Sequence, residues 1–214
     1  MASSSLRRTK IPENGHRFER LSEQSTDDFS LIVVDKQSIN ALCDNYPFEG
    51  QSSFRGTIHY QEEAEIGEGR NIELQFEFRD ESDLFILESE VDIPSVGSVI
   101  DRLNALAPEE FVIYQSLTVH RERLWKFFKR ASQLIEITVI SEHGEKMDFS
   151  ELNLDQPKDF RQYPIESATV IFDYTDKQIV TRYTNGKLSI NSDNPQAREY
   201  IIQLFERDVL GSEE

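Results

Sequence analysis

The residues best suited to chemistry are basic side chains gathered in one short segment, residues 115–133. This segment carries five basic residues against Glu122 alone, a net charge of +4, whereas the whole chain of 214 residues has a net charge of −17. On a helix, its apolar side chains would form one stripe and its basic side chains would lie opposite. The candidate contact face consists of Arg123, Lys126, Lys129 and Arg130, with Trp125 at the edge of the apolar stripe.

A basic amphipathic helix can neutralise phosphates, lie on an anionic membrane or dock on an acidic partner. In this chain it can also pair with the protein's own acidic body, because residues 27–114 carry a net charge of −15. Internal pairing, an external protein partner and a nucleic acid are therefore three readings of the same segment. Trp125, the only tryptophan, fits the core or its edge as well as a contact surface.

No sequence motif indicates a catalytic, cofactor-binding or metal-binding site. The four histidines have no H-x-x-x-H or H-E-x-x-H spacing, and the chain has no G-x-S-x-G, P-loop or dinucleotide-binding pattern. Cys43 is the only cysteine, which excludes a disulfide within the chain and a cysteine-based zinc site. We therefore expect no cofactor and no bound metal, and enzymatic activity has no support from the sequence.

The acidic composition is typical of a protein that works in concentrated salt. The chain has 40 acidic residues but only eight lysines beside fifteen arginines, and an ordinary acidic cytosolic protein is the alternative interpretation. At about 1 M salt the Debye length is only about 3 Å, so self-repulsion is largely screened. No apolar run approaches the length of a membrane span, and no hydrophobic segment follows Arg7-Arg8, so we expect a cytoplasmic protein.

Strand and helix signals recur on both sides of the basic segment. Residues 71–79 alternate strictly, which predicts a strand with one dry face and one wet, acidic face. Asn185-Gly186 predicts a β-hairpin, and Asn194 followed by Pro195 predicts the start of a helix. A second amphipathic helix is expected between Ser95 and Pro108.

These signals predict an α+β fold of antiparallel sheet covered by amphipathic helices, in two sheet-plus-helix halves with a disordered N-terminal tail. The expected parts are a flexible basic tail at 1–26, an acidic β-rich half ending in a helix at 27–114, the basic amphipathic helix at 115–133, and an antiparallel β half ending in a helix at 134–214. Everything from residue 27 onward can equally form one compact domain.

The expected function is that of a non-enzymatic interaction or regulatory module of the cytoplasm, which acts through its charge-segregated surface in a high-salt organism. Its partner would be another protein, with nucleic acid as the second choice. An alternative is an acidic nucleic-acid mimic that inhibits a DNA-binding protein, which needs carboxylates from residues 62–90 aligned on one sheet face. A further alternative is a hydrolase or transferase with paired carboxylates in a pocket.

Overall fold

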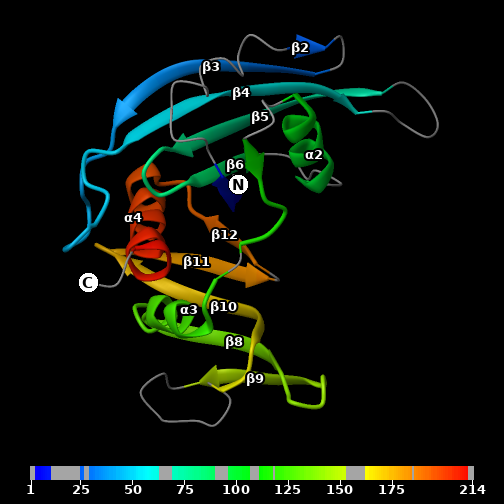
Figure 1. Ribbon diagram of the computed structural model, residues 1–214. Coiled ribbons are helices and arrows are strands. Elements are labelled where there is room, and N and C mark those ends of the chain that lie inside the picture. Colours follow the sequence, from blue (N-terminus) through cyan, green and yellow to red (C-terminus); the bar gives the residue numbers. More distant parts are fainter. Residues whose placement is uncertain are drawn as a thin grey trace.

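The computed structural model is a mostly antiparallel sheet with a few helices (Figure 1). It describes residues 3–10, 25–26, 29–62, 69–89, 96–106, 111–117, 119–152, 162–184 and 186–211. The strands are β1 (Ser3–Lys10), β2 (Ser25–Thr26), β3 (Phe29–Ser38), β4 (Ser52–Glu62), β5 (Arg70–Arg79), β6 (Leu84–Ser89), β7 (Val112–Ile113), β8 (Gln133–Ile140), β9 (Lys146–Leu152), β10 (Ile165–Tyr174), β11 (Lys177–Thr184) and β12 (Lys187–Asn191). The helices are α2 (Val96–Leu106), α3 (Arg121–Phe128) and α4 (Pro195–Phe205), and α4 continues into a π-helical turn, Glu206–Leu210.

Strand β1 lies in the middle of the sheet. The strand order is β2-β3-β4-β5-β6-β1-β12-β11-β10-β8-β9, so β1 joins the strands β2–β6 to the strands β8–β12. Its Leu6 is fully buried and pairs with Ile86, while Ser4 pairs with Ile190 on the other side. The prediction of a flexible tail at 1–26 is therefore wrong for Ser3–Lys10, and residues 11–24 lie outside the described part of the chain.

Ser3–Lys10 forms a strand because a central strand gains stability from backbone hydrogen bonds on both edges, and these do not require apolar side chains. Leu6 is the only apolar residue in this segment, so the sequence shows no apolar periodicity there, and the polar residues around Leu6 suggested a solvated tail. The pairing register explains why the segment is buried: Leu6 and Arg7 pair with Ile86 and Phe85 of β6, which are themselves buried.

Two hydrophobic clusters lie on opposite faces of the sheet, and β6 contributes to both. Phe85 and Leu87 belong to one cluster, which contains strands β3–β5 and is covered by α2 through Val99, Ile100 and Leu103. Leu84 and Ile86 belong to the other, which contains β8, β10, β11 and β12 together with α3 and α4. Helix α4 lies between the strands β2–β6 and the strands β8–β12 (Figure 1). The sheet-dominant part of the α+β prediction therefore agrees with the structure, and a division into two halves stays a prediction.

The basic helix is shorter than its predicted range of 115–133. Helix α3 spans only Arg121–Phe128, and residues on either side of it form hydrogen bonds with the turn between β11 and β12 and with β10 instead. The Leu117 amide donates to the Gly186 carbonyl, and the Ser132 amide donates to the Ile171 carbonyl just before β8 begins. Residues from Leu134 to Ile140 are rich in β-branched side chains, which favour a strand over a continued helix.

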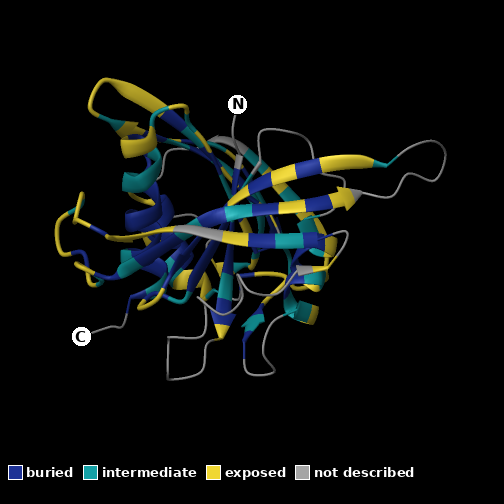
Figure 2. Cartoon of the chain, turned by 90° about the horizontal axis from the view of Figure 1, so that it is seen from above, coloured by how far each residue is buried: buried dark blue, intermediate teal, exposed yellow. Residues whose placement is uncertain are grey.

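Several local predictions are confirmed. Strand β5 buries alternate positions from Ile72 to Phe76, and Figure 2 shows bands of buried and exposed residues along several strands of the sheet. The Asn194 side chain accepts hydrogen bonds from the amides of Gln196 and Ala197 and so caps α4, with Pro195 in the first turn. Strands β11 and β12 pair through Thr184 and Lys187, and Gly186 in their turn has a φ of 76°, which a glycine adopts without strain. Among the described residues, no helix is long and apolar enough to span a membrane.

Candidate functional site

Helix α3 presents the predicted basic residues in two different environments. Arg121, Lys126, Lys129 and Arg130 are exposed, whereas Arg123 is half-buried. The helix is anchored by Leu124, Phe127 and Phe128, which are buried in the cluster beneath it. The ring of Phe127 lies 4.9 Å from that of Phe172 on β10 and 5.4 Å from that of Phe205 on α4. This packing fixes the orientation of the basic face toward solvent.

Two of the five basic side chains bind the protein's own C-terminal segment. The Arg123 guanidinium donates to the carbonyls of Val209 at 3.3 Å and Gly211 at 2.9 Å, at the end of the π-helical turn. Arg130 lies 3.4 Å from the buried carboxylate of Asp208 while 51% of its side chain stays exposed. A cation at the carboxyl end of a helix is favourable because the last carbonyls lack helical partners. Arg123 and Arg130 therefore pair within the protein, as one interpretation predicted. They bind the C-terminal helix rather than the acidic strands.

The other basic side chains face outward. Within the described chain, the ammonium groups of Lys126 and Lys129 take part in no hydrogen bond or ion pair. Arg121 donates to the carbonyl of Gln162, a neutral group that leaves its charge uncompensated. Lys126 follows Glu122 by four residues and precedes Arg130 by four, so it lies in the middle of the exposed face. We call Arg121, Lys126, Lys129 and Arg130 the α3 basic surface.

Trp125 does not belong to this surface. Only 5% of the residue is exposed, and its ring packs edge-on against Phe128 at a centroid distance of 6.0 Å. The prediction that placed Trp125 on the contact face is therefore wrong, and the reason is helical geometry. Its position between Leu124 and Phe128 turns the indole toward the sheet once the helix docks.

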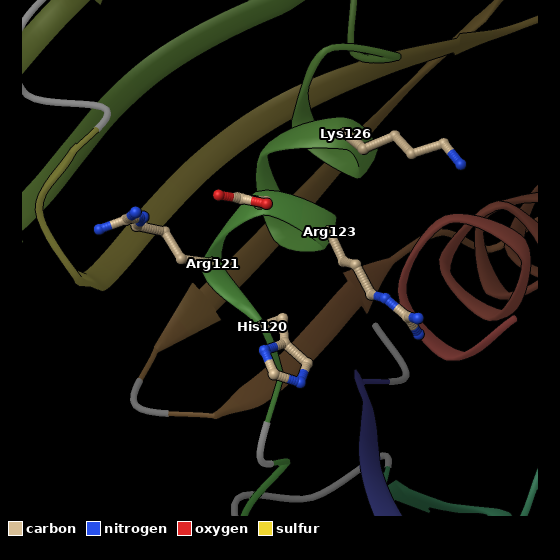
Figure 3. A pocket seen from close by; sticks show the side chains of 5 residues that line it. His120, Arg121, Arg123 and Lys126 are labelled. Carbon is tan, nitrogen blue, oxygen red and sulfur yellow. The ribbon is translucent and has the colours of Figure 1, made fainter. Parts of the chain in front are cut away.

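A hollow of about 440 Å³ opens beside the start of α3 and is lined by His120, Arg121, Glu122, Arg123 and Lys126 (Figure 3). The labelled side chains do not converge: Arg121 points to one side of the helix, whereas Arg123 and Lys126 point to the other. A small anion needs several donors directed at one point. The spread arrangement instead suits a broad contact with a partner that carries several negative charges.

The strongest ionic cluster in the described structure is buried elsewhere, and the sequence did not reveal it. Arg79, with a fully buried side chain, contacts three carboxylates: Glu77 at 2.8 Å, Glu206 at 2.7 Å and Glu199 at 2.5 Å. Glu77 and Arg79 belong to the face of β5 predicted to be wet, which is wrong for these two residues because α4 covers them. A four-residue contact between separate elements leaves no local sequence signal.

Three polar side chains donate hydrogen bonds to the carboxylate of Glu206. Tyr46 donates to Oε2 at 2.5 Å, while Ser82 and Gln51 donate to Oε1 at 2.5 and 3.0 Å. Burial alone would lower the pKa of Arg79, but Glu206, Glu77 and Glu199 together raise it well above its ordinary value. Burial alone would raise the pKa of Glu77, yet Arg79 and Arg55 lower it. Ion pairs and hydrogen bonds of this cluster thus connect β5, α4 with its π-helical turn, and the loop before β4.

The burial of these carboxylates bears on the two alternative functions, a nucleic-acid mimic and a hydrolase or transferase. A nucleic-acid mimic needs exposed carboxylates in a row, but along β5 the exposed Glu73 is followed by Gln75 and then by the buried, arginine-bound Glu77. A hydrolase needs paired acids in a pocket. Neither the hollow beside α3 nor a second hollow of about 390 Å³ near His59 and Glu73 is lined by Glu77, Glu199 or Glu206.

The described residues include no group of three or more His, Cys, Asp or Glu side chains arranged to hold a metal ion. Cys43 is half-buried, and burial raises the pKa of its thiol, which disfavours a reactive thiolate. His59 lies 3.8 Å from Glu73 on an exposed part of the sheet, as one pair without a third ligand among the described side chains.

No protein-family model matches the chain, and no curated protein matches its sequence.

Proposed function

We propose that the protein is a non-enzymatic interaction module that binds an acidic partner protein through the α3 basic surface. The observation that carries this proposal is that the side chains of Lys126 and Lys129 are exposed and have no ion-pair partner among the described residues, in a chain with a net charge of −17. A protein with so many carboxylates nearby has ample means to neutralise its cations internally, as it does for Arg79. Cations left outside that network are available to another molecule.

Electrostatics also supports a specific orientation of the partner. The acidic body repels an acidic partner from most directions, while the α3 basic surface attracts it at close range. Repulsion elsewhere on the surface thus selects one docking geometry. At about 1 M salt the Debye length is only about 3 Å, so the attraction then acts only between groups in direct contact.

The proposed setting is the cytoplasm of an organism with high internal salt. Its support is compositional: 40 acidic residues against eight lysines. Two of those eight lysines, Lys126 in α3 and Lys129 directly after it, lie within four positions of each other, and lysine is the rarest charged residue of this chain. Two neighbouring lysines on one exposed face suit a contact role better than a solubility role.

The test is capture of partners by three versions of the immobilised full chain: wild type, Lys126→Glu/Lys129→Glu, and the control Lys177→Glu/Lys187→Glu. Both double variants change the net charge by the same amount, and Lys177 and Lys187 are exposed residues of β11 and β12. Captured proteins are identified by mass spectrometry from native lysate at about 0.1 and 2 M KCl, a range that spans weak and strong screening.

We expect a set of acidic proteins that wild type and the control retain and that the α3 variant loses. Equal retention by all three versions would contradict the proposal that the α3 basic surface binds the partner. Capture of nucleic acid in place of protein, detected by nuclease treatment of the retained material, would replace the protein partner with the nucleic-acid reading.

A further inference from the structure

The C-terminal segment runs alongside α3 in the opposite direction. Arg130, just after the end of α3, lies 3.4 Å from the carboxylate of Asp208. Arg123, in the first turn of α3, donates to the carbonyl of Gly211 at 2.9 Å, further along the chain. The direction of the chain from Asp208 to Gly211 therefore leads toward the start of α3.

Gly211 fixes the position at which residues 212–214 begin. It is buried, and its amide donates to the Glu206 carbonyl at 2.7 Å. Its φ of −55° and ψ of 143° are extended rather than helical, so the π-helical turn ends here. Residues 212–214 lie outside the described part of the chain. At about 3.3–3.6 Å for each extended residue, they can reach about 10 Å from Gly211.

The hollow of about 440 Å³ beside the start of α3 is within this reach, because Arg123 both lines the hollow and binds Gly211. In Figure 3 the side chains of Arg123 and Lys126 point to the side of α3 on which the red C-terminal helix lies. The lining contains Arg121, Arg123 and Lys126 against Glu122 alone. The hollow therefore has a positively charged lining next to Gly211.

We infer that residues 212–214 occupy this hollow and pair Glu213 or Glu214 with Lys126, so that an acidic partner must displace them. The segment has two carboxylate side chains and no cation, which matches the positive lining. Its attachment at Gly211 keeps these carboxylates at a high effective concentration near α3. Exposed ion pairs are individually weak, so the segment competes with a partner without excluding it. The contact itself is independent of the proposed function, whereas its regulatory effect rests on that function.

The first test detects the contact by treating the full chain with a water-soluble carbodiimide, which couples a carboxylate to a lysine that is already paired with it. At about 0.1 M KCl it should link residues 213–214 to Lys126, and mass spectrometry of the peptides locates the link. At about 2 M KCl the yield should fall, because salt screens an exposed pair. Lys146, which lies 2.7 Å from Glu166, is the positive control, and Lys36, an exposed lysine of β3, is the negative control. No link to Lys126, or an equal yield at Lys36, would overturn the contact.

The second test measures competition through the affinity for a fluorescently labelled acidic peptide, followed by anisotropy. At about 0.1 M KCl the variant Glu213→Gln/Glu214→Gln should bind about two- to fivefold more tightly than wild type, because the internal competitor has lost its charge. The control Glu142→Gln/Glu145→Gln removes the same charge from exposed residues in the turn between β8 and β9. It should bind like wild type.

Equal affinity of the three proteins for the peptide would overturn the competition. A gain of the same size in the control would assign the effect to net charge and would overturn it as well. If none of the three bound the peptide, the proposed function would be contradicted instead, and the carbodiimide link would decide whether residues 212–214 occupy the hollow.

Discussion

Arg79 on β5 and Glu206 at the end of α4 form an ion pair with a distance of 2.7 Å between Nη1 and Oε2, and both side chains are completely buried. The two residues are 127 positions apart in the sequence. Their contact joins the strands β2–β6 to the C-terminal helix, which packs on β10 and β12. The ion pair therefore holds together parts of the chain that have separate hydrophobic clusters.

Replacing Arg79 by methionine should destabilise the protein by about 3–5 kcal/mol, because it leaves Glu77, Glu199 and Glu206 without their shared cation. Urea unfolding at neutral pH measures the change. Arg55→Met is the matched control, since Arg55 also binds Glu77 but is partly exposed, and its loss should cost less than about 1 kcal/mol. Equal losses for the two variants would show that the buried cluster has no special role.

Acid should weaken the fold in part through Glu77. Its pKa is lowered in the folded state, so its contribution to stability is complete above the unfolded-state pKa of about 4.3 and is lost as the pH falls below that value. Glu77→Gln cannot titrate, and its stability should vary less with pH over this acidic range. Urea unfolding of both proteins at a series of pH values measures the two slopes. Parallel slopes would mean that other carboxylates dominate the acid response.

Removal of the N-terminal segment should abolish folding. A chain that begins at Asp27 lacks β1, so β6 and β12 each lose a neighbour in the middle of the sheet. We expect no cooperative thermal transition. Leu6→Ala in the full chain is the milder version and should cost about 2–5 kcal/mol, because Leu6 is fully buried. A cooperative melt of the shortened chain at the wild-type temperature would contradict the central position of β1.

Added salt should raise the melting temperature between about 0.1 and 2 M, because it screens repulsion within a chain of net charge −17. This general effect should be similar in potassium chloride and potassium gluconate at equal ionic strength, because screening does not depend on the identity of the anion. A flat or falling melting temperature, beside a neutral protein of similar size, would argue against adaptation to high salt.

The basic residues of α3 should separate into structural and surface classes. Arg123→Met should lower stability, because it removes two hydrogen bonds to the C-terminal carbonyls of Val209 and Gly211. Lys126→Glu/Lys129→Glu should change stability by less than about 0.5 kcal/mol for each residue, since exposed unpaired side chains contribute little. Thermal melts of both variants make the comparison. A large loss in the lysine variant would mean that these side chains support the fold.

Local signals in the sequence predicted many of the elements correctly. The alternation in residues 71–79 predicted β5, and Asn194 with Pro195 predicted the start of α4, because capping and periodicity act over a few residues. The predicted extent of α3 was wrong, since Leu117 before the helix and Ser132 after it form hydrogen bonds with Gly186 and Ile171, which are distant in the sequence. Trp125 was misplaced because a residue at the edge of an apolar stripe can turn either way until the helix docks.

Long-range features could not be predicted in this way. Strand β1 depends on its pairing with β6 and β12, and the Arg79 cluster depends on α4 covering one end of β5. For the candidate site, the sequence identified the basic residues of α3. It could not divide them into Arg123 and Arg130, which bind the C-terminal segment, and Lys126 and Lys129, which face solvent.

The most direct test of the proposed function is the affinity of the full chain for a fluorescently labelled acidic peptide, measured by anisotropy at low and high salt. Wild type and Lys177→Glu/Lys187→Glu should bind with similar dissociation constants, and Lys126→Glu/Lys129→Glu should bind at least about tenfold more weakly, with a smaller dependence on salt. Equal affinity of the three proteins for the peptide would contradict the proposal that the α3 basic surface recognises an acidic partner.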